Sequence, residues 1–136
     1  MEVNQDTGVI VVKRCVVAMD SGPISNPDGI RNQVEGGTLQ GVSRTLLEEV
    51  TWNTERVTSV DWRSYHPLYL GAEVPKIESV LINQSDVAAM GAGETAVTVT
   101  AAAIGNAFFD ATGVRLREIP FTPERVKAAL RASRAG

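Results

Sequence analysis

A short glycine-containing segment ends in a glutamate at positions 91–94, where the sequence reads Gly91-Ala92-Gly93-Glu94. A carboxylate that projects from such a loop can act as a general base, because the small residues let a flat ligand approach the backbone closely. The alternative is structural. An acidic side chain in the first turn of a helix is stabilised by the free N–H groups there, by about 0.3–1 kcal/mol. The residues alone leave both interpretations of Glu94 open.

The same segment continues as Thr95-Ala96 and so matches the dinucleotide-binding pattern G-x-G-x-x-G/A. In that fold the glycine turn follows a strand directly, whereas nine residues separate Asn83 from Gly93 here. Glu118, near the end of a later predicted strand, would be the acid that binds the ribose. A dinucleotide-binding half-domain is therefore the weaker alternative.

A second group of residues suited to ligand contact is Gln33, followed by Gly36, Gly37 and Gly41. Each glycine costs up to about 1 kcal/mol relative to alanine inside a helix. Their clustering indicates that something approaches the backbone closely, either another structural element or a ligand. The Gln33 amide offers both a donor and an acceptor at the same place. Its structural alternative is a solvated helix residue.

The whole chain of 136 residues, with 43% hydrophobic residues, 21% charged residues and a net charge of −3, has the composition of one globular domain. Thirteen Lys and Arg against 16 Asp and Glu argue against a nucleic-acid partner. The longest uncharged apolar stretch covers 15 residues, 95–109, and is too short to span a bilayer, so we expect no membrane segment. Cys15, the single cysteine, rules out an internal disulfide or iron–sulfur cluster within this chain, and is expected to be a small buried hydrophobe. His66, the single histidine, excludes a multi-histidine zinc site and is expected in a loop.

Helical spacing of apolar residues predicts three helices, over 30–50, over 95–112 and from 122 onward. Asn26 and Pro27 ahead of the first helix are typical of an N-cap followed by proline at the first helical position. Gly113 is a typical stop for the second helix.

β-Branched and alternating apolar residues predict strands at 8–19, 57–62, 76–83 and 114–119. A turn over residues 4–8 has hairpin composition, which makes residues 1–3 the end of a preceding strand. The expected fold class is α+β, with mixed strands and about three helices, in a single domain over residues 1–136.

Several segments, in this order, resemble the C-terminal region of molybdenum hydroxylase large subunits. They are Asn26-Pro27-Asp28-Gly29, Gln33-Val34-Glu35-Gly36-Gly37, Gly41-Val42-Ser43, Gly91-Ala92-Gly93-Glu94 and the stretch 107–115. These large subunits form the xanthine dehydrogenase and aldehyde oxidase family. The resemblance runs from about Val3 to Leu130 and is strongest to the molybdopterin-binding beta subunit of the isoquinoline 1-oxidoreductase and aldehyde dehydrogenase type.

The resemblance implies a role for each candidate residue. Glu94 would be the catalytic base, taking a proton from the metal-bound hydroxyl as its oxygen attacks an electrophilic carbon. Gln33 would contact the molybdopterin, and the loop Gly91-Ala92-Gly93 would pass close to it. The molybdenum is held by the cofactor, so the resemblance implies no protein metal ligand. Relatives often have proline where this chain has Thr95.

The implied function is oxidative hydroxylation of an aldehyde or an N-heterocycle, with water as the oxygen source. The implied cofactor is molybdopterin with molybdenum, in the cytosine dinucleotide form. The implied partners are the remainder of the molybdopterin-binding subunit, a small [2Fe-2S] subunit and a small-molecule substrate, in the cytoplasm or the periplasm. Because large subunits of the family are several times longer, we expect a C-terminal fragment that by itself is inactive, holds no cofactor and self-associates into a homo-oligomer. The alternative is a non-catalytic binding or assembly module that retains the fold.

Overall fold

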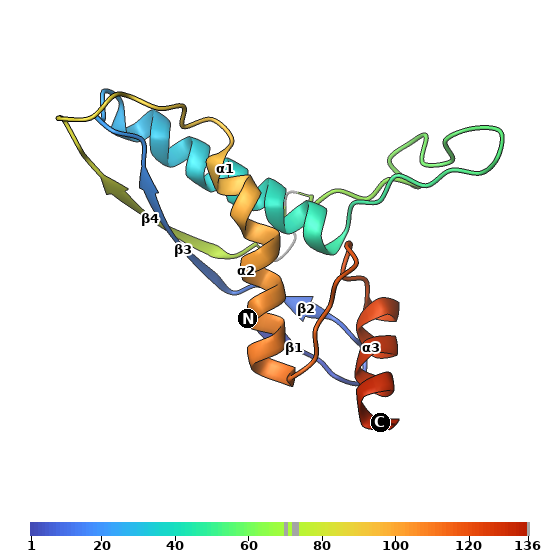
Figure 1. Ribbon diagram of the computed structural model, residues 1–136. Helices are drawn as coiled ribbons and strands as arrows, with labels where there is room; N and C mark the ends of the chain where they lie inside the picture. The colour runs from blue at the N-terminus through green and yellow to red at the C-terminus, as the bar shows by residue number, and fades with distance from the viewer. Residues whose placement is uncertain (70, 72–73, 136) are drawn as a thin grey trace.

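The computed structural model describes residues 1–69, 71 and 74–135 (Figure 1). The elements in chain order are β1 (Glu2–Val3), β2 (Ile10–Val11), β3 (Arg14–Asp20), α1 (Pro27–Leu46), β4 (Lys76–Ile82), α2 (Thr95–Thr112) and α3 (Pro123–Ala135). The long helix α1 packs mainly against α2 and also contacts β3 and β4, while β1, β2 and α3 gather at the other end of α2 (Figure 1). The predicted α+β class with three helices is confirmed within the described residues.

The strand predicted over 8–19 is two strands that belong to different sheets. β1 and β2 form an antiparallel hairpin, and the predicted turn between them is confirmed, since the Gly8 N–H donates to the Asn4 carbonyl at 2.7 Å. β3 instead pairs in parallel with β4, from Arg14 opposite Lys76 onward. The exposed charged pair at 13–14 marks the point where the chain leaves one sheet for the other.

Helix α1 begins as predicted and ends earlier than predicted. The Asn26 side chain accepts from the Gly29 N–H at 2.9 Å, which caps the helix with Pro27 as its first residue. The helix stops at Leu46 because the Thr45 carbonyl accepts a hydrogen bond from the Phe121 N–H at 2.6 Å. A tertiary hydrogen bond thus takes the place of the next helical one.

Helix α2 has the predicted bounds and ends at Gly113, whose φ of +73° is the left-handed conformation that favours glycine. Its apolar stripe, with Ile104 buried and Phe108 fully buried, faces the hydrophobic core. The predicted third helix is α3. The core residues come from β2, the three helices and the segments next to them: Ile10, Val12, Val42, Ile104, Phe108, Phe121, Val126 and Leu130.

The strand predicted over 57–62 is wrong. Residues 47–66, which we call the arm, extend away from the helices as a long loop (Figure 1). The arm contains one isolated bridge, Trp52 with Val57, and its Trp52, Val60 and Trp62 side chains are 71–74% exposed. β-Branched residues form a strand only where a neighbouring strand accepts their backbone hydrogen bonds.

The strand predicted over 114–119 is also wrong. This segment is irregular, and Val114 and Leu116 pack against the core instead of alternating across a sheet. The dinucleotide alternative therefore loses the second strand that it needs. Its ribose-binding candidate, Glu118, pairs with Arg125 at 3.0 Å.

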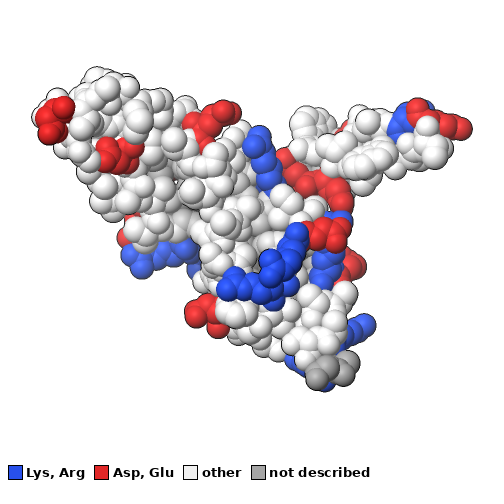
Figure 2. Space-filling view, viewed as in Figure 1, with Lys and Arg blue, Asp and Glu red and all other residues white. Residues whose placement is uncertain are grey.

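Charged side chains of both signs lie side by side where the C-terminal end of α1 meets α3 (Figure 2). The Arg125 guanidinium lies 2.7 Å from the Glu49 carboxylate there and also contacts Glu118.

Among the helices that the structure describes, none is both long and apolar enough to cross a membrane.

Candidate cofactor-binding site

Two of the four glycines in α1, Gly37 and Gly41, allow a close helix–helix contact. A Cβ added at Gly37 would lie 3.2 Å from the Ala96 Cβ, and one added at Gly41 would lie 2.5 Å from the Thr100 Cβ. Ala96 and Thr100 both belong to α2, so packing against another element explains these two positions. Gly36 differs, because a Cβ there would meet nothing within 4 Å.

Gly36 lies beside an open hollow of about 480 Å³ where the middle of α1 meets the N-terminal end of α2. The hollow is lined by Gln33, Gly36, Gly37, Gln40, Gly93 and Glu94, and we call it the Gln33–Glu94 hollow. The Gln33 Nε2 donates to the Gly93 carbonyl at 3.4 Å. The structure therefore brings Gln33 and Glu94, which are 61 positions apart in the sequence, to one surface.

Gly91 lies at a second, adjoining depression. It lines a volume of about 460 Å³ together with Gly93, Glu94, Thr95 and Thr98. Glu94 and Gly93 contribute to both depressions, so the glycine loop separates two open spaces at the start of α2. Ala92 lies between the two glycines and is half-buried.

Glu94 occupies the N-cap position of α2, but its side chain makes no capping hydrogen bond. A carboxylate at this position is still favoured by the helix dipole, so the structure removes the capping hydrogen bond from the structural interpretation and leaves the dipole part of it. The carboxylate is exposed at the hollow, where it can meet a ligand.

The glycine loop is held by the turn that follows β3. The Met90 N–H donates to the Ser21 carbonyl at 2.9 Å. Next to it, Gly22 has a φ of +80°, and a Cβ there would lie 2.7 Å from the Ala88 carbonyl oxygen, so only glycine fits. Thr95 donates through Oγ1 to the Met19 Sδ at 3.1 Å. The start of α2 is thereby tied to the end of β3.

Sequence reasoning missed Gln40 as a residue of the hollow. The available signal was its spacing, because a residue seven positions after Gln33 lies two turns further along the same face of a helix. Gln33 and Gln40 thus flank the open backbone at Gly36.

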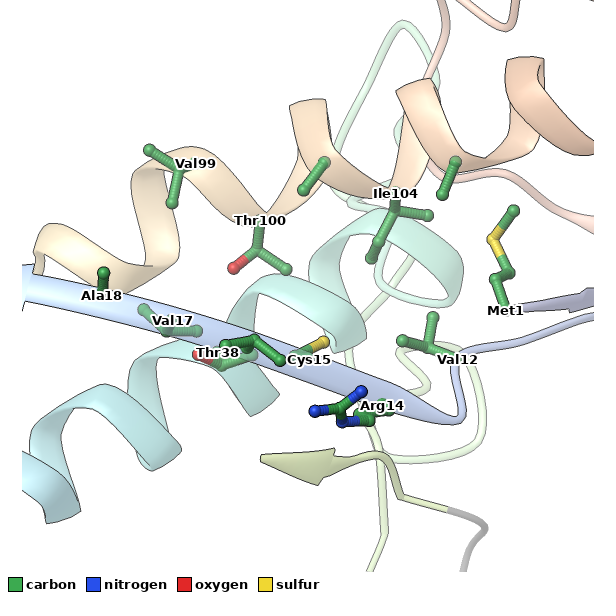
Figure 3. Close-up of a pocket in the computed structure, with 13 residues that line it drawn as sticks. Met1, Val12, Arg14, Cys15, Val17, Ala18, Thr38, Val99, Thr100 and Ile104 are labelled. Atoms are coloured by element: carbon green, nitrogen blue, oxygen red, sulfur yellow. The ribbon is translucent and has the colours of Figure 1, made fainter. Parts of the chain in front are cut away.

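The lone cysteine and the lone histidine lie away from this hollow. Cys15 packs against the core but is half-buried instead of fully buried as predicted, and this partial burial raises the pKa of its thiol. It lines an apolar groove of about 340 Å³ between β3 and α2, where Val99 and Ile104 project from the helix (Figure 3). His66 is exposed in the arm. Among the described residues, no group of three or more His, Cys, Asp or Glu is arranged to hold a metal ion.

Known proteins share this fold and are similar to this chain in sequence. A family model described as the molybdopterin cofactor-binding domain matches residues 1–75. One subunit of the nicotinate dehydrogenase of Pseudomonas putida is 43% identical over 128 residues, which cover 94% of this chain and 11% of that protein. The beta subunit of the isoquinoline 1-oxidoreductase of Brevundimonas diminuta is 32% identical over 120 residues, covering 88% of this chain and 15% of that protein. The solved aldehyde oxidoreductase of Desulfovibrio gigas matches with a TM-score of 0.78 and 29% identity, over 95% of this chain and 14% of that chain.

The fold and the hollow thus define an α+β domain that offers a ligand site between the middle of α1 and the N-terminal end of α2. The chain belongs to the molybdopterin cofactor-binding domain family of the molybdenum hydroxylases, which include xanthine dehydrogenase and aldehyde oxidase, as its motifs predicted. It spans between 11% and 15% of the length of these relatives and solved structures. Two of them are, by name, subunits of oxidoreductases.

The residues at the hollow fit a flat pterin. Gln33 and Gln40 place two amides there, and each amide can both donate to and accept from the polar edge of a heterocycle. The backbone between them is open at Gly36. On the facing side, a Cβ at Gly93 would make an ordinary contact of 3.6 Å with the Gln33 Nε2, which places the loop backbone next to the Gln33 amide.

Proposed function

We propose that this chain, as part of a longer molybdopterin-binding protein, contributes Gln33 as a cofactor contact and Glu94 as the general base of an oxidative hydroxylation. The substrate is an aldehyde or an N-heterocycle, and water is the oxygen source. The observation that carries the proposal is that both side chains line one open hollow, joined through the Gln33 to Gly93 hydrogen bond.

Gln33 and the glycine loop would hold the cofactor. Because an amide donates and accepts at once, Gln33 can bond to the Gly93 carbonyl and to the ring edge of the pterin together. Gly91, Ala92 and Gly93 carry little or no side chain, so a flat group can lie against their backbone. The proposal includes the cytosine dinucleotide form of the cofactor.

Glu94 would move the proton. When bound, the molybdenum cofactor supplies the two-electron oxidation. Glu94 would accept the proton of the water-derived oxygen nucleophile as that oxygen forms its bond to the substrate carbon. The C–H bond at that carbon would break at the same time, and its hydrogen would leave with the electron pair as the two-electron equivalent that the cofactor would take up. Its exposed carboxylate, not engaged in capping, suits this task because a base must reach the proton within about 2.6–3.2 Å.

The partners in this proposal are the remainder of the molybdopterin-binding protein and a small [2Fe-2S] subunit that accepts the electrons. The names of relatives support the substrate class, since they include nicotinate, isoquinoline and aldehyde oxidoreductases. The small fraction of each relative that this chain covers supports a larger assembly.

The test is Glu94→Gln in the complete protein, with turnover measured per bound molybdenum. Loss of a general base costs typically 10²–10⁴-fold, so we expect turnover to fall by at least about 10²-fold while molybdenum content stays near normal. Glu55→Gln, the same change at an exposed position of the arm, is the matched control and should retain turnover. Retention of most activity by Glu94→Gln would instead favour the non-catalytic assembly module.

A further inference from the structure

The contact between Gly41 and Thr100 is the closest glycine contact between these two helices. A Cβ added at Gly41 would lie 2.5 Å from the Thr100 Cβ and 2.8 Å from both its Cγ2 and its Oγ1. Both residues are buried. The Thr100 Oγ1 donates to the Ala96 carbonyl at 2.8 Å, which satisfies the hydroxyl within its own helix. The Thr100 side chain, directed from α2 toward α1 and β3 in Figure 3, therefore rests directly on the Gly41 backbone.

Apart from Gly29, whose close contact is with its own cap residue Asn26, the close contacts lie where the two helices meet. A Cβ at Gly36 would meet nothing within 4 Å, and one at Gly105 would make an ordinary contact of 3.6 Å with the Phe121 ring. Gly37, one turn before Gly41, repeats the close contact in a milder form at 3.2 Å from the Ala96 Cβ. The distance between α1 and α2 is thus set by the contacts of Gly37 with Ala96 and of Gly41 with Thr100.

The same two helices form this contact and, on its N-terminal side, the hollow. Thr100 lies six residues after Glu94 and Gly41 lies eight residues after Gln33, which correspond to about 9 Å and 12 Å along the helix axes. A helix is rigid over such distances, so a displacement at the contact is carried to the hollow.

We propose, on the basis of the function proposed above, that Gly41 and Thr100 are positioning residues. Their contact fixes the spacing of α1 and α2 and thereby places Glu94 relative to the cofactor held by Gln33. Only a small displacement of Glu94 is compatible with turnover, because a shift of roughly 1 Å between reacting groups can lower the rate on the order of 10²-fold.

The decisive variant is Gly41→Ala in the complete protein. The added Cβ must move from 2.5 Å to at least a normal contact of about 3.5 Å, so the helices must separate by about 1 Å. We expect turnover per bound molybdenum to fall roughly 10-fold to 10²-fold. In the crystal structure of the variant, we expect the Gln33 Nε2 to Gly93 oxygen distance to increase beyond 3.4 Å.

The rescue variant is Gly41→Ala combined with Thr100→Gly. It removes all three Thr100 atoms within 2.8 Å of the added Cβ. Turnover should therefore return to within a few-fold of the wild type, and the Gln33 to Gly93 distance to within a few tenths of an ångström. Gly41→Ala combined with Thr100→Ala is the matched comparison. It keeps the residue-100 Cβ that lies 2.5 Å from the added Cβ, so turnover should stay as low as in Gly41→Ala alone. Gly105→Ala, the same substitution on α2 away from α1, is the matched control and should retain turnover.

A purely structural role gives a different result. If Gly41→Ala lowers only the yield or the melting temperature, while the molybdenum-loaded molecules keep wild-type turnover and the 3.4 Å contact, the proposal is overturned. Failure of Thr100→Gly to rescue overturns it as well. If Gly41→Ala does not fold, Gly37→Ala with and without Ala96→Gly is the replacement pair, with a smaller effect expected in the same direction.

The Glu94→Gln variant separates this inference from the function on which it rests. Retained turnover in Glu94→Gln removes the proposed base, and the role of the contact in placing that base falls with it. Lost turnover in Glu94→Gln together with unchanged turnover in Gly41→Ala overturns only the positioning role.

Discussion

The two candidate side chains are ordinary amino acids whose chemistry depends on where they lie. Glutamate at a helix N-terminus usually bonds to the free N–H groups there, yet Glu94 makes no such bond and is exposed at the hollow. Glutamine on a helix surface is usually solvated, yet the Gln33 amide reaches the Gly93 carbonyl of another element. In both cases the neighbouring glycines leave the room that a ligand needs.

Gln33→Ala should lower molybdenum content more than turnover per bound molybdenum, because an amide that contacts the cofactor contributes to binding and not to proton transfer. Metal analysis beside steady-state kinetics in the complete protein measures the two quantities separately. Asn32→Ala, at the adjacent exposed position of α1, is the control and should leave both unchanged. Full molybdenum content with slowed turnover would move Gln33 into the catalytic set.

The pairing of β3 with β4 shows how an element arranges charges that are distant in sequence. In this parallel register the Arg14 guanidinium donates two hydrogen bonds to the Glu78 carboxylate, at 2.7 and 3.0 Å, and Lys76 contacts the same group. The hydrogen bonds from Arg14, followed by those from Lys76, lower the pKa of Glu78 to about 2. The strands thus carry an ion-pair cluster on an exposed face.

Arg14→Gln should raise the pKa of Glu78 from about 2 toward the ordinary glutamate value of about 4.3. Because the pKa is lower in the folded state than in the unfolded state, ionised Glu78 stabilises the fold above the unfolded value. That contribution is lost as the pH falls through about 2. A carboxyl-carbon NMR titration measures the pKa of Glu78. Arg131→Gln on α3 is the control and should leave that pKa at about 2. A Glu78 pKa that is equal in the Arg14→Gln variant and the wild type would contradict the pairing.

Several large apolar side chains lie on the surface of the molecule instead of in its core. Trp52, Val60 and Trp62 of the arm and Val16 and Val80 of the strand pair are all more than half exposed. The apolar groove between β3 and α2 is also open (Figure 3). Large contiguous apolar patches on a protein usually mark contact surfaces.

The isolated chain of 136 residues should therefore self-associate or show poor solubility, and should contain no molybdenum. Sedimentation velocity with elemental analysis measures both. A variant that combines Trp52→Ser with Trp62→Ser should sediment closer to a monomer, because it removes the most exposed aromatic surface of the arm. A monodisperse wild-type monomer with stoichiometric molybdenum would show that the chain is complete by itself.

Local sequence determined the helices, because their hydrogen bonds join residues four positions apart. The start of α1 at Asn26 and the end of α2 at Gly113 depend on the cap residues themselves, and both were predicted. The glycine loop with its glutamate and the Gln-Val-Glu-Gly-Gly segment were also sufficient to indicate the family.

Tertiary structure decided the strands and the site. A strand needs a partner that can lie anywhere in the chain, so composition predicted strands over 57–62 and 114–119 where the described residues offer no partner strand, and missed the change of sheet between β2 and β3. The end of α1 was likewise set by a distant residue, Phe121. Gln33 and Glu94 meet only because glycines of α1 let α2 pack against it at close range, a non-local fit of surfaces that the order of residues does not reveal.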